Sequence, residues 1–266
     1  MCQPSAAADA KTCRIAALPV DGLRVDVSRQ AVHDSASSAR VWVRTVKPAQ
    51  VMVLVSVAGQ ERPFGPVPST IESDLTAVVR VHGLQPDTRH PYRVLVDGHP
   101  VPMPAGAAIV TAPAPGAATR MTLAFGADFH KTGLWNRPLL DRIRIRGNSA
   151  VLLLGDNALD DRDNRVGLHC SDYLLRDLSP AWRELVATTA VYATWDDHDY
   201  LNNDQSGIPS RFTEADRTAV RRVWTQSWNN PSYGFEDRGQ GIFFRTRLSP
   251  CDLIMLDTRY FRTKPG

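Results

Sequence analysis

Cysteine is scarce in this chain of 266 residues, and its four cysteines are too sparse and unevenly spaced for a disulfide scaffold or a zinc motif. Cys2 and Cys13 are a candidate disulfide pair if the protein is exported. No apolar run approaches the roughly 20 residues that a transmembrane helix needs. The net charge of +3 is small and evenly spread, which argues against nucleic acid or a membrane surface as a partner. The apolar content, 43%, is that of an ordinary globular protein with one large domain or two smaller ones.

The first ten residues lack the charged and apolar regions of a signal peptide. They are polar and rich in alanine, which resembles the leader of an exported protein after processing, and Cys2 is a candidate lipid-attachment site. We therefore expect a periplasmic, extracellular or lipid-anchored protein whose signal peptide is not present in this chain. A non-native leader is the alternative explanation.

An all-β domain is expected over residues 18–112. Four stretches rich in β-branched residues predict strands, and Asp97-Gly98 predicts a hairpin turn after the last of them. These stretches are 40–45, 51–57, 75–81 and 91–96. Short strands at this spacing favour a β-sandwich. Residues 84–94 resemble the corner sequence of fibronectin type III domains, with Tyr92 as the corner tyrosine, and a plain turn followed by a strand is the alternative.

A second domain is expected over residues 120–266, after a linker at 113–119 that is rich in Pro, Gly and Ala. Strands and helices alternate in it, which favours a sheet with its polar site at the carboxyl ends of the strands. The expected strands are 121–125, 151–154 and 189–195, and the expected helices lie around 138–146 and 173–186. Further along we expect a helix from an N-cap at Thr213 to Trp228, a strand at 241–247, and another strand of the sheet at 253–256.

Acidic and other polar side chains follow each of the three strands. Asp128 and His130 follow the first, and Asp156 and Asn157 follow the second. The third is followed by a run, 196–204, that holds four carboxylates, one histidine and two carboxamides. Carboxylates this close together repel one another unless a cation or several donors compensate. The pattern therefore predicts a metal site assembled from three remote segments.

These segments resemble a known family. Asp128-Phe-His130, then Gly155-Asp-Asn157, then Trp195-Asp-Asp-His-Asp199 with Asn202-Asn203 behind it are similar to the first three signature blocks of the calcineurin-like metallophosphoesterases. The third block most resembles the PhoD-like (alkaline phosphatase D) branch, in which a β-domain commonly precedes the catalytic domain. The resemblance covers roughly residues 120–260 and implies a four-layer αββα domain.

The resemblance also implies a reaction, in which a metal-bound hydroxide at a dinuclear site hydrolyses a phosphomonoester or phosphodiester. Asp128 and His130 would hold the first metal, and Asp156 would bridge the two. Asp197, with Asp196 beside it, would hold the second. His198 would donate a proton or stabilise charge at the leaving oxygen. The expected substrate-binding residues are Asn157, Asn202, Asn203 and Arg259.

The identity of the two metal ions is open among Ca, Mn, Fe and Zn. Ligands that are mostly oxygen suit calcium, manganese or iron better than structural zinc. Substrate preference and oligomeric state have no readable signal in the sequence.

Two features depart from the family pattern. Leu159 stands where many PhoD-like proteins have a tyrosine, and Asp160 and Asp161 are the nearby residues that could compensate. Such enzymes also take histidine ligands from blocks further downstream, whereas all seven histidines here occur by His198. The resemblance therefore implies an incomplete catalytic domain with weak metal binding and little turnover of its own.

Each site residue also has a structural interpretation. Asp128 or Asp156 alone could be a helix N-cap, His130 or His198 alone a hydrogen-bonding residue, and Arg259 a surface or salt-bridge residue. At the level of the whole chain, one alternative is a cell-surface binding module with a structural Ca²⁺. Another is a metal-dependent hydrolase of esters other than phosphate.

Overall fold

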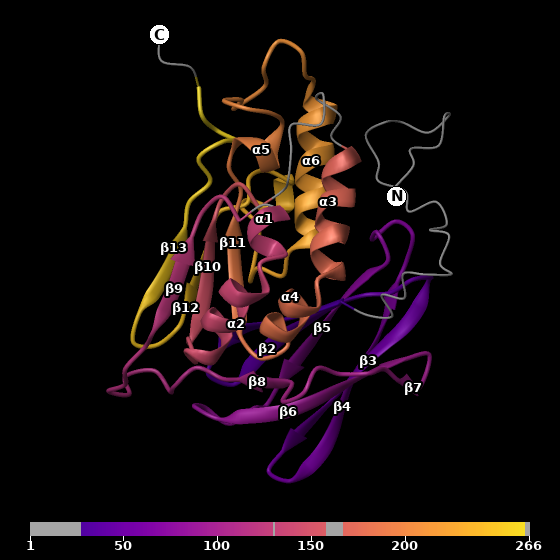
Figure 1. The fold of residues 1–266 in the computed structure, drawn as a ribbon, viewed down its shortest axis with the longest axis vertical. Helices are drawn as coiled ribbons and strands as arrows, with labels where there is room; N and C mark the ends of the chain where they lie inside the picture. The colour runs from indigo at the N-terminus through magenta and orange to yellow at the C-terminus, as the bar shows by residue number, and fades with distance from the viewer. Residues whose placement is uncertain (1–27, 130, 158–166, 264–266) are drawn as a thin grey trace.

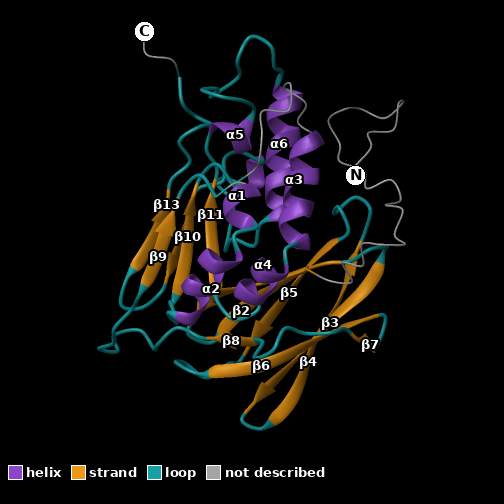
Figure 2. Cartoon of the chain, in the orientation of Figure 1, coloured by secondary structure: helices purple, strands orange, loops and turns teal. Residues whose placement is uncertain are grey.

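The computed structural model describes residues 28–129, 131–157 and 167–263. The first part of the chain forms antiparallel sheets, and the second part forms a small parallel sheet with helices packed against it (Figure 1). Figure 2 shows helices only in the second part. No helix among these residues is long and apolar enough to cross a membrane.

Two antiparallel sheets make up the first part. One has the strand order β1-β2-β5, and the other has the order β4-β3-β6-β7 with β8 also paired to β6. Alternating burial along β3 shows why they pack together, because every second side chain from Ala49 to Val57 is buried, and the valines among them pack in a valine-rich core to which both sheets contribute. Asp97 and Gly98 have positive φ angles of 49° and 80° between β6 and β7, which confirms the expected hairpin turn. The strands are β1 (Ser28–Ser35), β2 (Ser38–Arg44), β3 (Ala49–Val57), β4 (Gln60–Ser69), β5 (Thr76–His82), β6 (Arg89–Val96), β7 (His99–Pro100) and β8 (Ala108–Val110).

Three parallel strands form the sheet of the second part, in the order β11-β10-β9. They are β9 (Leu123–Gly126), β10 (Ala150–Leu154) and β11 (Ala190–Thr194), at the places expected from the sequence. The side chains of β10 alternate between two cores, with Val151 and Leu153 facing the helices and Ala150 and Leu152 facing the opposite side. Burial of a parallel strand on both faces accounts for the apolar run at 150–153, and Leu154 at its end is exposed.

The helices cover one face of this sheet (Figure 1). The single helix expected around 173–186 is two helices, because Pro180 lacks a backbone N–H and disfavours a helical residue before it. Ser179 accepts a hydrogen bond from the Trp182 N–H and caps the second of them. Thr213 caps α6 as expected, in a capping box with Asp216. The helices are α1 (Lys131–Leu134), α2 (Arg137–Ile145), α3 (Gly167–Leu178), α4 (Pro180–Val186), α5 (Asp197–Tyr200), α6 (Glu214–Ser227) and the 3₁₀ helix η1 (Glu236–Arg238).

A hairpin covers the other face of the sheet. Its strands, β12 (Phe244–Arg247) and β13 (Asp252–Met255), pair antiparallel with each other. Phe244 and Met255 pack in one cluster with Leu152 of β10 and Tyr192 of β11. The expectation that residues 253–256 add a strand to the parallel sheet was wrong. A short apolar run such as 253–256 predicts a strand but does not say which strand it pairs with.

Buried charges join the two parts of the chain. Arg44 on β2 contacts Asp74 at 2.5 Å and Asp177 on α3 at 3.1 Å, and the second carboxylate oxygen of Asp177 accepts two hydrogen bonds from Arg176. Burial lowers the pKa of Arg44, but the carboxylates beside it raise the pKa by more, so this arginine stays charged. The Arg176 guanidinium lies 4.3 Å from the ring centroid of Trp228. Asp177 thus forms an ion pair with one arginine from each part of the chain.

Replacement of Asp177 by alanine is expected to lower the free energy of unfolding by about 3–5 kcal/mol, because two arginines would remain buried without their shared partner. Urea unfolding followed by circular dichroism measures the change. The matched control is Asp252→Ala, which removes an exposed pair with Arg245 and Arg247 and should change stability by about 0–1 kcal/mol. An equal loss of unfolding free energy in Asp177→Ala and Asp252→Ala would show that the buried network stabilises the fold no more than an exposed ion pair does.

Candidate metal centre

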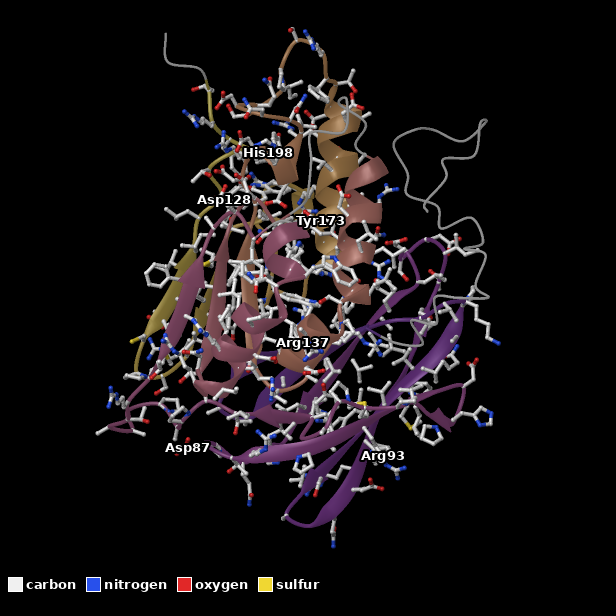
Figure 3. All side chains as sticks on the ribbon, viewed as in Figure 1. Asp87, Arg93, Asp128, Arg137, Tyr173 and His198 are labelled. Atoms are coloured by element: carbon white, nitrogen blue, oxygen red, sulfur yellow. The ribbon has the colours of Figure 1, made fainter. Side chains whose placement is uncertain are left out.

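The carboxyl ends of β9, β10 and β11 bring the three acidic segments together. Figure 3 places Asp128 and His198 at the end of the sheet that points away from the first part of the chain. Among the described residues, Asp156, Asp197 and His198 each offer a potential ligand atom within 4.8 Å of the other two. The sequence placed Asp156 and Asp197 in one metal site and His198 beside it, and the structure brings all three to one point.

Two of the aspartates adopt a backbone conformation that is uncommon for residues with a side chain. Asp128 and Asp156 have φ angles of 56° and 53°, in the left-handed region that aspartate tolerates better than most residues. The Asp128 N–H donates to the Gly155 carbonyl at 3.1 Å, which connects these two loops directly. Asp128 is exposed. Asp128 and Asp156 thus leave two neighbouring strands through the same kind of turn.

Gly155 allows the loop after β10 to approach the loop after β11. Its φ is 118°, and a Cβ at this position would lie 2.5 Å from the Cβ of Asp196. No other residue fits without displacing that aspartate. This close approach places Asp156 beside Asp197.

The surroundings of the Asp156 carboxylate do not fully compensate its negative charge. Its Oδ1 atom is buried and has no hydrogen-bond partner among the described residues. Partial burial raises the pKa of Asp156, and the nearby charges of Asp197, Asp196 and Asp128 raise it further, while His198 opposes the shift. A cation bound here would supply the missing partner. The donor set therefore fits a metal ion, and its oxygen-rich character fits the hard cations.

Asp199 holds the two central loops in place. Its buried carboxylate accepts hydrogen bonds from the Asn157 N–H at 2.9 Å, the Tyr173 hydroxyl at 3.0 Å and the Asp196 N–H at 3.3 Å. Burial, and then the adjacent Asp199 charge, raise the pKa of Tyr173 well above its usual value, so the hydroxyl remains a donor. The sequence showed Asp199 only as one acid of a cluster, because its partners lie 26 and 42 positions away.

Arg259 contacts both acids at the start of α5. Its guanidinium donates to Asp196, and its Nη2 atom lies 3.3 Å from Asp197. Burial lowers the pKa of Arg259, but the hydrogen bond and the charges of the two carboxylates raise it by more. Asp257 fixes the backbone of Arg259 by accepting its N–H at 3.0 Å, and the same oxygen accepts the indole N–H of Trp195 at 2.8 Å. Arg259 is thus a positioned cation beside the candidate metal ligands.

The remaining predicted site residues lie around this centre. Asn157 is 1% exposed, and its side-chain amide donates to the Thr194 carbonyl at 2.9 Å. Asn202 is half-buried and Asn203 is exposed, in the loop that leads from α5 to residue 204. In that loop the Asp204 N–H donates to Asp197 at 2.5 Å. His130, Leu159, Asp160 and Asp161 lie outside the described residues.

The fold and the centre define a class, a mixed α/β protein with a candidate metal-binding cluster of acids at the carboxyl ends of parallel strands. A solved structure entitled "Structure of PhoD" is similar to this chain, with a TM-score of 0.68 and 18% sequence identity. The likeness covers 89% of this chain and 52% of the PhoD chain, so this chain spans about half the length of that protein. At this identity the comparison shows a PhoD-like fold. The family described as a domain of unknown function (DUF7800) matches residues 31–114, and no curated protein sequence matches the chain.

Substitution of Asp199 by asparagine is expected to weaken Mn²⁺ binding by about 10–100-fold, the range seen when a residue that orients metal ligands is replaced. The new amide would face the N–H groups of Asn157 and Asp196 and push the two loops apart. Calorimetric titration with Mn²⁺ measures the change, with far-ultraviolet circular dichroism as the folding check. Asp141→Asn, on the exposed face of α2, is the control. Unchanged Mn²⁺ affinity in Asp199→Asn would show that the loops do not depend on this carboxylate.

Proposed function

We propose that this chain contributes metal-binding residues to the site of a metal-dependent phosphoric ester hydrolase. The observation that carries the proposal is the convergence of Asp156, Asp197 and His198, with a buried Asp156 oxygen that lacks a hydrogen-bond partner among the described residues. The resemblance of the three sequence blocks to PhoD-like metallophosphoesterases and the PhoD-like fold support it. Substrates are proposed to be phosphomonoesters or phosphodiesters.

Asp128 and His130 would hold one metal, Asp197 the other, and Asp156 would lie between them. When bound, such ions polarise a phosphoryl oxygen and lower the pKa of a water molecule. His198 is proposed to hold a proton near the leaving oxygen, since its ring lies beside Asp156 and Asp197. Calcium, manganese and iron suit this set better than zinc, by ligand type.

The other residues of the site are proposed to bind the substrate or to hold the site in place. Arg259 offers a planar pair of N–H donors to a phosphoryl group, and Asn202 and Asn203 lie on the adjoining loop. Asp196 is paired with Arg259, so its contribution as a ligand would require that pair to rearrange. Asn157 is buried, and we propose that it supports the site by holding the loop after β10.

The finer features of the fold are also part of the proposal. Helices, parallel sheet and hairpin form three successive layers, and Ile254 on the outer face of the hairpin is 63% exposed. A further helical layer over that face would complete the αββα arrangement of the family. The domain limits at 18–112 and 120–266, the fibronectin-like character of the first domain, and export from the cell are proposed on the sequence evidence alone.

Substitution of Asp156 by asparagine tests the function. We expect Mn²⁺ affinity to fall by more than about 100-fold, since even residues outside the ligand set change affinity by 10–100-fold. Any Mn²⁺-dependent hydrolysis of 4-nitrophenyl phosphate or bis(4-nitrophenyl) phosphate should be lost with it. Asp87→Asn, an exposed acid in the first part of the chain and far from the centre in Figure 3, is the control. Metal binding that is the same in Asp156→Asn, or hydrolysis of 4-nitrophenyl acetate but of neither phosphate ester, would overturn the proposal.

Replacement of Arg259 by glutamine should raise the affinity for Mn²⁺ and lower the affinity for inorganic phosphate. Mn²⁺ should bind more tightly, because a cation that competes for Asp196 and Asp197 is removed. Inorganic phosphate should bind the Mn²⁺-loaded protein about 10–100-fold more weakly, the effect of losing hydrogen bonds to a charged group. Calorimetry with each ligand measures both. Loss of both affinities together would show that Arg259 only maintains the fold.

A further inference from the structure

A large open pocket lies beside the metal centre. Its volume is about 1010 Å³, and it is lined by residues 204–210, Arg217 and residues 260–263. These segments are the loop that follows α5, the start of α6 and the end of the described chain. In Figure 1 both the loop and the chain end lie at the α5 end of the sheet. The pocket is therefore on the side of the molecule where the metal ligands converge.

Backbone hydrogen bonds connect the pocket wall to the metal centre. The N–H of Asp204 donates to the Asp197 carboxylate, and the N–H of Gly207 donates to the Arg259 carbonyl at 2.8 Å. The Tyr200 hydroxyl donates to the Gly207 carbonyl at 2.7 Å and fixes the loop from the other side. The wall of the pocket is thereby joined to Asp197 and Arg259, two residues of the proposed metal and phosphate site.

Phe261 gives the pocket an aromatic wall that is supported from behind. Its ring centroid lies 4.8 Å from that of Tyr260 and 6.1 Å from those of Phe235 and Phe243. The ring is nevertheless 44% exposed, and Ile208 in the same lining is 45% exposed. Two large apolar side chains held open to solvent in one concave site favour a ligand that covers them.

The charges of the lining do not indicate a second anionic group on the ligand. Arg217 is paired with Glu214 at 2.6 Å and lies over the Tyr260 ring at 4.2 Å. Arg262 has no ion-pair partner among the described residues, but Asp204 contributes a carboxylate to the same lining. The feature of the lining that selects a ligand is therefore the exposed apolar surface of Phe261 and Ile208.

We propose that this pocket holds the alcohol part of the substrate, and that the preferred substrates are phosphate esters whose alcohol part contains an aromatic ring, which stacks on Phe261. This inference rests on the proposed function and adds a substrate class to it. Aromatic stacking changes affinity by an amount that a direct comparison can resolve, about three- to tenfold. Ile208, in the same lining, would contact the edge of that aromatic ring.

Phosphonates test the proposal without turnover, because their carbon–phosphorus bond is not an ester. The Mn²⁺-loaded chain is titrated with methylphosphonate and with phenylphosphonate. The wild type should bind phenylphosphonate about three- to tenfold more tightly, and Phe261→Ala should reduce this ratio to about one with methylphosphonate affinity unchanged. Phe261→Leu, which keeps an apolar side chain, should give an intermediate ratio. Phe125→Ala removes another exposed phenylalanine, outside the pocket, and should keep the wild-type ratio.

The outcomes separate the two proposals. Binding of neither phosphonate to the metal-loaded wild type overturns the proposed function, and the substrate class with it. Binding of both with equal affinity, or an equal loss of both in Phe261→Ala, leaves the function standing and overturns the aromatic subsite.

Discussion

The buried carboxylate of Asp199 is the interaction on which the arrangement of the centre depends. It is 1% exposed and accepts hydrogen bonds from donors in the loop after β10, in α3 and at the start of α5. A buried carboxylate is stable only if such donors remain in place. Each donor thereby fixes one segment relative to the others, and Asp156 and Asp197 are adjacent because their loops share this partner. Gly155 contributes the space that the approach requires.

Much of the centre was predictable because it depends on local signals. Apolar runs that end in acids identified all three strands, and parallel strands present their carboxyl ends at one edge. The contacts that hold the acids in place were not predictable, because Asp199 and Tyr173 carry no local sign of a partnership across 26 positions. The hairpin of β12 and β13 was missed for a similar reason, since a strand pattern does not identify its neighbour. The break at Pro180 follows from a known preference of proline.

The two parts of the chain meet in a contact that is unusually rich in buried charge. Arg44, Asp74, Arg176 and Asp177 are all at most 5% exposed, and burial raises the pKa of Asp74 despite the adjacent Arg44. Hydrogen bonds from Trp42 to the Gln226 carbonyl and from Asn229 to the Arg40 carbonyl extend the contact. The first part therefore supports α3 and the end of α6, and α3 in turn carries Tyr173 to the metal centre.

That shared interface has a consequence for how the protein loses its structure. Opening it would expose the guanidinium groups of Arg44 and Arg176 and the indole of Trp42 to water at once, because these side chains are buried where the two parts meet. An intermediate with one part folded and the other unfolded would be destabilised by the full free-energy cost of exposing these groups to water. The chain is therefore expected to behave as a single cooperative unit, although its sequence suggests two modules joined by a linker.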